Sequence, residues 1–120
     1  MNEMIGNTPG NRRHAARKPA NAAAAVTDLI SGQTMGHVGN LSSTGMLLIG
    51  HQPPRSEALY QVAVTLPGTE PRRGQVVAIT LGIQEQWHEP AASGQTWAGY
   101  RIVAISDEDV AQLHRWLAAH

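Results

Sequence analysis

Four cationic side chains lie within seven residues near the start of the chain, in the stretch "RRHAARK" (12–18). The formal net charge of the 120 residues is zero, and Glu3 is the only acidic residue that precedes these cations, so the positive charge is concentrated locally. Such a cluster suits a solubility tail, a nucleic acid, a membrane surface or a small anionic ligand. Because the positive charge is confined to this short stretch, we expect its partner to contact only that part of the chain and its surroundings.

The composition narrows these classes. A chain of 120 residues with 42% apolar residues has the size and apolar content of one globular domain. A net charge of zero argues against a dedicated DNA-binding protein, which usually presents a broad basic surface. The absence of cysteine excludes disulfides, thiol catalysis and cysteine-based zinc sites. No signal-like or membrane-length apolar segment is present, so we expect a cytoplasmic location.

The pattern along the chain predicts a tail followed by one domain. Residues 1–11 lack periodicity and are rich in Asn, Gly and Pro, so we expect a flexible tail. Residues 12–120 form the domain, with a barrel over about 20–105 and a helix over about 107–119. Since Pro19 disfavours helix at the residue before it, the basic stretch should be a loop or short turn.

Short apolar segments separated by turn residues predict β-strands. They cover residues 23–31, 34–42, 45–50, 59–67, 74–87 and 96–105. Period-2 alternation places Tyr60, Val62, Val64 and Leu66 on one face of their strand, and Val77, Ile79, Leu81 and Ile83 on one face of theirs. Strands joined by short turns without intervening helices predict an antiparallel sheet that curls into a barrel.

The C-terminal segment predicts an amphipathic helix. Ser106, followed three residues later by Asp109, resembles a capping box. Val110, Leu113 and Leu117 follow the helical period and form one apolar stripe. We expect this stripe to close over one mouth of the barrel.

Two short motifs carry a family resemblance. Residues 13–17 have the form R-x-x-x-R, and "NLSSTG" (40–45) has the form [D/N]-x-S-x-x-G. In this order, ahead of several strands and a C-terminal helix, they resemble the motifs of the PilZ domain. The stretch "GYRIVAISDEDVAQLHRWL" (99–117) is similar to the last strand and closing helix of that family. The resemblance covers residues 12–118 and implies a six-stranded antiparallel β-barrel, mainly β, with a C-terminal α-helix, that binds the bacterial second messenger cyclic di-GMP.

The resemblance assigns ligand contacts to both motifs. Arg13 and Arg17 would pair bidentately with phosphate or guanine and stack on the bases, and an extended loop puts their Cα atoms up to about 13 Å apart. Asn40 and Ser42 are two residues apart on a strand, which places both side chains on one face, where they could hydrogen-bond guanine. Gly45 would allow a left-handed or tightly bent backbone and close approach of the ligand. The family often has Asp where this chain has Asn40, and the amide removes a charge from guanine recognition.

Two further cations flank these motifs. In the family, a long basic residue at the position of Arg12 is associated with binding of a stacked, intercalated pair of ligand molecules. The alternative is that Arg12 is a solvated flanking charge. Lys18 would contribute general electrostatic attraction or nothing.

Other chemistry has little support. The histidines are scattered, without an H-x-x-x-H pair, which predicts no metal site: His14, His37, His51, His88, His114 and His120. Ser42 and Ser43 lack the G-x-S-x-G elbow of a nucleophile. We therefore expect no enzymatic activity, no metal and no cofactor apart from the ligand cyclic di-GMP.

The three tryptophans leave several roles open. We expect Trp97 to pack in the barrel and Trp87 to be a partly exposed loop residue, although an aromatic near a barrel mouth could also stack on a base. Trp116 lies one position off the helical stripe, so it belongs either to the edge of the core or to a partner surface.

Three functional hypotheses follow. The first is a stand-alone cyclic di-GMP receptor that relays its signal to an unidentified protein partner by contact. The second is a PilZ-like adaptor that binds protein constitutively without nucleotide, and the intact motifs argue against it. The third, a barrel that binds single-stranded nucleic acid, would need several exposed aromatics and a wider basic groove. The absence of phenylalanine and the zero net charge make it the weakest of the three, so we expect no nucleic-acid polymer as a partner.

Overall fold

A computed structural model describes residues 18–19, 24–67 and 76–118. Its strands are β1 (Lys18–Pro19), β2 (Ala25–Asp28), β3 (Thr34–Leu41), β4 (Gly45–Gly50), β5 (Leu59–Pro67), β6 (Val76–Pro90) and β7 (Thr96–Ala104). A single 3-10 turn, η1 (Ala92–Gly94), joins β6 to β7, and helix α1 (Asp107–Ala118) follows. The expected tail over 1–11 and the residues Arg12, Arg13 and Arg17 lie outside the described part of the chain.

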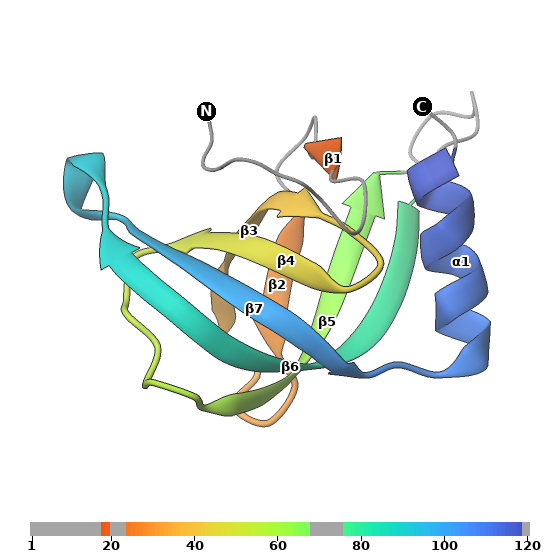
Figure 1. Ribbon diagram of the computed structural model, residues 1–120, viewed down its shortest axis with the longest axis horizontal. Coiled ribbons are helices and arrows are strands. Elements are labelled where there is room, and N and C mark those ends of the chain that lie inside the picture. The colour runs from red at the N-terminus through yellow and green to blue at the C-terminus, as the bar shows by residue number, and fades with distance from the viewer. Residues whose placement is uncertain (1–17, 20–23, 68–75, 119–120) are drawn as a thin grey trace.

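The described strands form an antiparallel barrel (Figure 1). Pairing runs in the order β3-β2-β5-β6-β7-β4, and β4 pairs back to β3, so the strands from β2 to β7 close a six-membered ring. The short β1 adds to the outside of this ring by pairing with β3. The predicted six-stranded antiparallel barrel with a C-terminal helix is confirmed.

The alternation in the sequence corresponds to the buried face of the barrel. Val62 pairs with Leu81 and Val64 pairs with Ile79, and all four side chains are almost completely buried. Burial of each such side chain contributes about 1.5–3 kcal/mol of hydrophobic free energy. Aliphatic side chains thus fill the interior in place of the absent phenylalanine.

Strand β6 extends further than the apolar pattern indicated, because it has a different partner in each half. Its first half pairs with β5, from Pro67 opposite Val76 onward, and its second half pairs with β7 as far as Pro90 opposite Thr96. The β6–β7 hairpin therefore projects from the barrel on the side opposite α1 (Figure 1).

The close approach of β3 and β4, where the barrel closes, requires glycine at two positions. Gly36 has φ +153°, and a Cβ there would overlap the backbone carbonyl of Ile49. Gly50 faces the carbonyl of Met35 in the same way. The two strands approach this closely only because both positions lack a side chain.

Helix α1 covers one end of the barrel, as expected, but the residues that it buries differ in part from the predicted apolar stripe. Leu113 and Trp116 are its buried residues, whereas Val110 and Leu117 are half-buried. Trp116 therefore belongs to the core and not to an exposed partner surface. The expectation for Trp97 was wrong, because its side chain points outward from β7 and is 41% exposed.

The start of α1 is tied to the sheet by a carboxylate. The Ser106 hydroxyl accepts a hydrogen bond from the Asp109 N–H (3.2 Å), which is one half of the expected capping box. The Asp109 carboxylate instead accepts from the backbone N–H of Thr80 in β6 (3.0 Å). The β6–β7 pairing begins only at Gly82, so the helix supplies the acceptor that a neighbouring strand does not.

We expect Asp109→Ala to lower the free energy of unfolding by about 1 kcal/mol or more, because it leaves the Thr80 N–H without its charged acceptor. Asp107→Ala is the matched control, since it removes a carboxylate from the same helical turn and costs only the helix-dipole interaction of about 0.3–1 kcal/mol. Urea unfolding of both variants measures the difference. Equal losses in the two would contradict the role given to Asp109.

Candidate functional site

The N-x-S-x-x-G motif lies at the turn between β3 and β4. Asn40 is half-buried in β3, where its register partners are Leu47 in β4 and Pro19 in β1. Gly45 is the first residue of β4 and pairs with Arg101 of β7. The motif therefore lies where β1, β3, β4 and β7 meet.

Ser42 organises this turn. Its side chain is completely buried, and its hydroxyl oxygen accepts hydrogen bonds from the N–H groups of Thr44 (3.2 Å) and Gly45 (3.1 Å). Its own N–H donates to the Gly45 carbonyl (2.9 Å). Strand β3 ends at Leu41, so the alternation from which we placed Asn40 and Ser42 on one face does not continue through Ser42.

Gly45 has an ordinary backbone rather than a left-handed one. Among the described glycines, the positive φ angles belong to Gly32, Gly36 and Gly94. The bend itself lies at Ser43–Thr44, and Gly45 is buried at its end. What glycine contributes at position 45 is therefore the absence of a side chain and not a special φ.

The basic stretch is connected to this turn through β1. Lys18 pairs with Leu41 and Pro19 with Asn40. The arginines of the R-x-x-x-R motif precede Lys18 directly in the chain and are not among the described residues. Covalent geometry limits the Cα of Arg17 to about 3.8 Å from that of Lys18, and that of Arg13 to about 18 Å.

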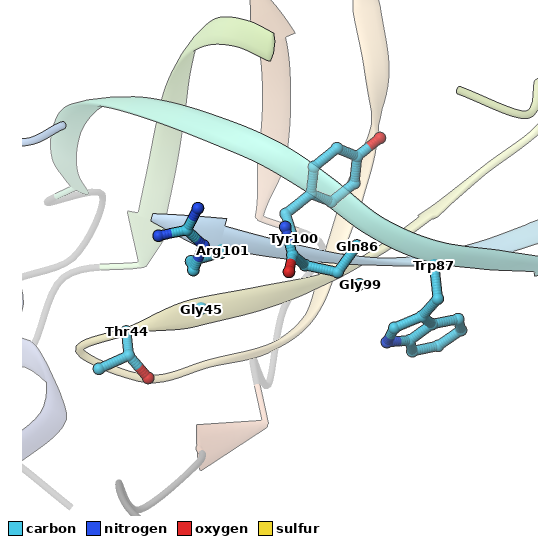
Figure 2. A pocket seen from close by; sticks show the side chains of 7 residues that line it. All are labelled: Thr44, Gly45, Gln86, Trp87, Gly99, Tyr100 and Arg101. Atoms are coloured by element: carbon cyan, nitrogen blue, oxygen red, sulfur yellow. The ribbon is translucent and has the colours of Figure 1, made fainter. Parts of the chain in front are cut away.

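A pocket of about 250 Å³ lies beside the turn (Figure 2). Its lining residues come from the β3–β4 turn and from β6 and β7: Thr44, Gly45, Gln86, Trp87, Gly99, Tyr100 and Arg101. Arg101 and Thr44 lie toward one end and the Trp87 indole toward the other. The Arg101 guanidinium donates to Gln84 Oε1 (3.0 Å) and remains exposed. A cation and an indole thus border one hollow, which suits a planar anionic ligand.

Trp87 belongs to strand β6 and not to a loop, although it is exposed as expected (46%). Its register partner is Gly99, and a Cβ at position 99 would lie 2.5 Å from Trp87 Cε2 and closer still to Nε1. The indole therefore lies directly over the glycine backbone. The sequence signal that could have located this contact is a glycine inside an otherwise regular strand pattern.

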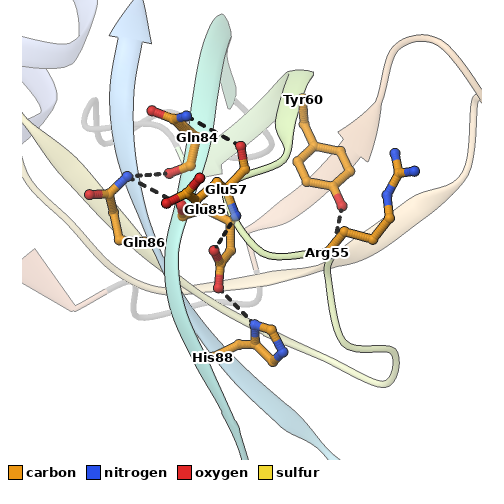
Figure 3. A network of polar contacts seen from close by, with 7 residues as sticks. All are labelled: Arg55, Glu57, Tyr60, Gln84, Glu85, Gln86 and His88. Carbon is orange, nitrogen blue, oxygen red and sulfur yellow. Dashed lines mark hydrogen bonds and ion pairs between the residues drawn. The ribbon is translucent and has the colours of Figure 1, made fainter.

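A buried carboxylate, that of Glu85, directly precedes the pocket residue Gln86 in β6 (Figure 3). Glu85 is 2% exposed, its Oε1 accepts a hydrogen bond from the Glu57 N–H (2.7 Å), and its Oε2 contacts Nδ1 of His88 (2.7 Å). The hydrogen bond from the Glu57 backbone and the one with His88 lower the pKa of the Glu85 carboxyl below its ordinary value. Sequence reasoning missed this residue, although the inward alternation through Ile83 continues to position 85.

The ring of Tyr100 is part of the same region of the core. It makes an edge-to-face contact with Tyr60 (centroids 6.1 Å apart), and burial raises the pKa of Tyr100. The Arg55 N–H donates to the Tyr60 hydroxyl (3.4 Å). Tyr100 therefore has the Tyr60 ring on β5 and its register partner Glu85 on β6 as neighbours.

No group of three or more His, Asp or Glu side chains among the described residues could hold a metal ion. No helix within the described ranges is long and apolar enough to cross a membrane.

Two solved structures are similar to this one. The first is the inhibitor of motility MotI/DgrA of Bacillus subtilis, with a TM-score of 0.70, 15% identity and 88% of this chain covered. This chain spans about half (49%) of that protein. The second is the PilZ domain of YcgR from Escherichia coli with c-di-GMP, with a TM-score of 0.57, 18% identity and 88% of both chains covered.

No protein-family model matches the sequence, and no curated protein matches it either. The structural likeness shows that the chain has the fold of a PilZ domain.

We expect the stability of the protein to fall as the pH drops below the ordinary range of carboxyl groups. The pKa of Glu85 is depressed in the folded state, so its contribution is present above the unfolded-state pKa and is lost as the pH falls through the folded-state pKa. Unfolding measured from pH 7 down to pH 3 should show a shallower pH dependence in Glu85→Gln than in the wild type. Glu89→Gln, which removes an exposed carboxylate from the same strand, is the matched comparison; a wild-type slope in Glu85→Gln would contradict the assignment.

Proposed function

We propose that this chain is a receptor for cyclic di-GMP that has no catalytic activity and acts as a stand-alone effector in the cytoplasm. The ligand would be held between the R-x-x-x-R segment and the N-x-S-x-x-G turn, with contacts from Arg12, Arg13, Arg17, Asn40, Ser42 and Gly45. The signal would pass to a protein partner through the surface that the bound ligand changes.

One observation carries the proposal: β1, which directly follows the R-x-x-x-R segment in the chain, pairs with the end of β3 that carries the start of the N-x-S-x-x-G motif. Lys18, next to the last arginine of R-x-x-x-R, is in register with Leu41, next to Asn40 and Ser42. The residues that follow the first motif in the chain are thereby paired with the strand that carries the start of the second motif, more than twenty residues later. The fold supports the same reading, because the PilZ domain of YcgR was solved with c-di-GMP.

Each described motif residue has a distinct place in the proposed site. Asn40 would meet the guanine edge, since its amide both donates and accepts. The Ser42 hydroxyl already bonds within the turn, so its main contribution would be to hold the loop from Ser43 to Gly45 in shape for the ligand. The adjacent pocket adds Arg101 and Trp87, a second cation and an aromatic face.

The deciding experiment is a calorimetric titration of the full chain with cyclic di-GMP, compared with GTP and cyclic di-AMP. Selective binding of cyclic di-GMP supports the receptor. The alternative, an adaptor that binds protein constitutively, predicts no heat with any of the three nucleotides.

We expect Arg13→Ala or Arg17→Ala to weaken cyclic di-GMP binding by about 2 kcal/mol or more, because each removes charge-assisted bonds and stacking. Arg115→Ala, an exposed cation on α1, is the control and should bind as the wild type does. Circular dichroism should show an intact fold in all three variants. Wild-type affinity in both motif variants would remove the arginines from the site.

Arg12 should control how many ligand molecules bind. A second, intercalated ligand brings two more phosphates and guanines, which need a cation beyond Arg13 and Arg17. Titration of Arg12→Ala should therefore show a fall from two ligands per chain toward one. An unchanged stoichiometry with weaker binding would reduce Arg12 to a supporting charge.

A further inference from the structure

Strand β6 contains a β-bulge at Gln86, next to the pocket. Glu85 pairs with Tyr100, and Trp87 pairs with the very next residue of β7, Gly99, so Gln86 has no register partner. The Gln86 amide donates to the carbonyls of Gln84 (3.3 Å) and Glu85 (3.2 Å), within its own strand. The side chain of the bulged residue therefore stabilises the bulge through hydrogen bonds to its own strand.

The bulge reverses the faces of the residues that follow it. In a regular strand, residues i and i+3 point to opposite faces. Glu85 and His88 nevertheless contact each other at 2.7 Å, because the extra residue brings His88 to the inner side. The same reversal turns Trp87 outward, onto Gly99. The contact between Glu85 and His88 and the outward direction of Trp87 thus require the same backbone conformation.

Glu85 also holds the loop between β4 and β5 against the bulge. Glu57, in that loop, has φ +60°, a left-handed conformation that a residue with a side chain adopts at a cost. Its N–H donates to Glu85 Oε1, and its carbonyl accepts from the Gln84 amide (3.2 Å). The Glu85 N–H donates to the Ala58 carbonyl (3.0 Å). One carboxylate therefore connects the loop, the bulge and His88 (Figure 3).

We propose that Glu85 is a positioning residue for the pocket: by binding the Glu57 N–H and His88, it keeps the bulge in place and so holds the Trp87 indole against Gly99. Glu85 belongs to β6, its side chain is buried, and it does not itself line the pocket. Its effect on any ligand would pass through the direction of Trp87.

Nuclear magnetic resonance of the full chain tests this without a ligand. The wild type should show nuclear Overhauser effects between the Trp87 ring protons and the Gly99 α-protons, together with ring-current shifts of those α-protons. Both should be lost in Glu85→Ala. They should be largely kept in Glu85→Gln, whose amide offers an acceptor to the Glu57 N–H and a donor to the imidazole.

Two controls separate positioning from general loss of stability. Val64→Ala weakens the core far from the bulge, and Glu89→Ala removes an exposed carboxylate from β6; both should keep the Trp87–Gly99 signals. Wild-type signals in folded Glu85→Ala, or their loss in Val64→Ala as well, would overturn the proposal. If Glu85→Ala does not fold, His88→Ala decides. It removes one of the two contacts of the Glu85 carboxylate, at a side chain that is 28% exposed, and unchanged Trp87–Gly99 signals in this variant would overturn the proposal too.

A titration with cyclic di-GMP, which rests on the function proposed above, measures the consequence for binding. Affinity should fall about tenfold in Glu85→Ala, within the range of one base–aromatic stacking contact, and remain near wild type in Glu89→Ala. Failure of the wild type to bind would refute the proposed function alone, since the resonance comparison still decides the role of Glu85.

Discussion

The structure depends on the way strand β6 divides its hydrogen bonding between two partners. Over Val76–Gln84 it pairs with β5, and over Gly82–Pro90 it pairs with β7, so one strand joins the two halves of the barrel. Where β7 no longer reaches, Asp109 of the helix accepts the Thr80 N–H, and this contact fixes the helix over the core. At the other end, the bulge at Gln86 builds one wall of the pocket. The helix and the pocket are therefore two consequences of how this strand finds acceptors along its length.

Much of the barrel could be predicted from the sequence because one rule, period-2 alternation, governs it. Val62, Val64, Ile79 and Leu81 alternate strictly and are all buried. That rule fails where the backbone register shifts, and a shift leaves no mark in the pattern of apolar residues. Trp87 was expected to be a partly exposed loop residue, but it lies in the strand just beyond the bulge. Trp97, two residues before the glycine beneath that indole, shares the outer face of β7 and is exposed.

The candidate site was predictable in part, and the reason lies in the kind of contact involved. Motif spacing brought attention to Asn40, Ser42 and Gly45, and these residues are together at the β3–β4 turn. Spacing gave no information on which groups border this turn from neighbouring strands, because Arg101 and Trp87 belong to β7 and β6, far along the chain. The structure adds a role for Ser42 that the spacing did not indicate, since its hydroxyl accepts hydrogen bonds from N–H groups of its own turn. A short polar side chain that follows a strand commonly bonds its neighbouring backbone in this way.

The polar groups around Glu85 explain why a buried carboxylate is tolerated there. An isolated charge in a barrel interior is costly, but Glu85 receives a backbone N–H on one oxygen and an imidazole on the other. The left-handed conformation of Glu57 is the cost of presenting that N–H, and Gln84 and Ala58 secure the loop that carries it. Gly99 completes the arrangement from the opposite side, because any side chain there would push the indole away. The outer wall of the pocket is thus specified by two residues: Glu85 holds the bulge from the inner side, and Gly99 leaves space for the indole on the outer side. Neither residue needs a side-chain contact with a ligand to do so.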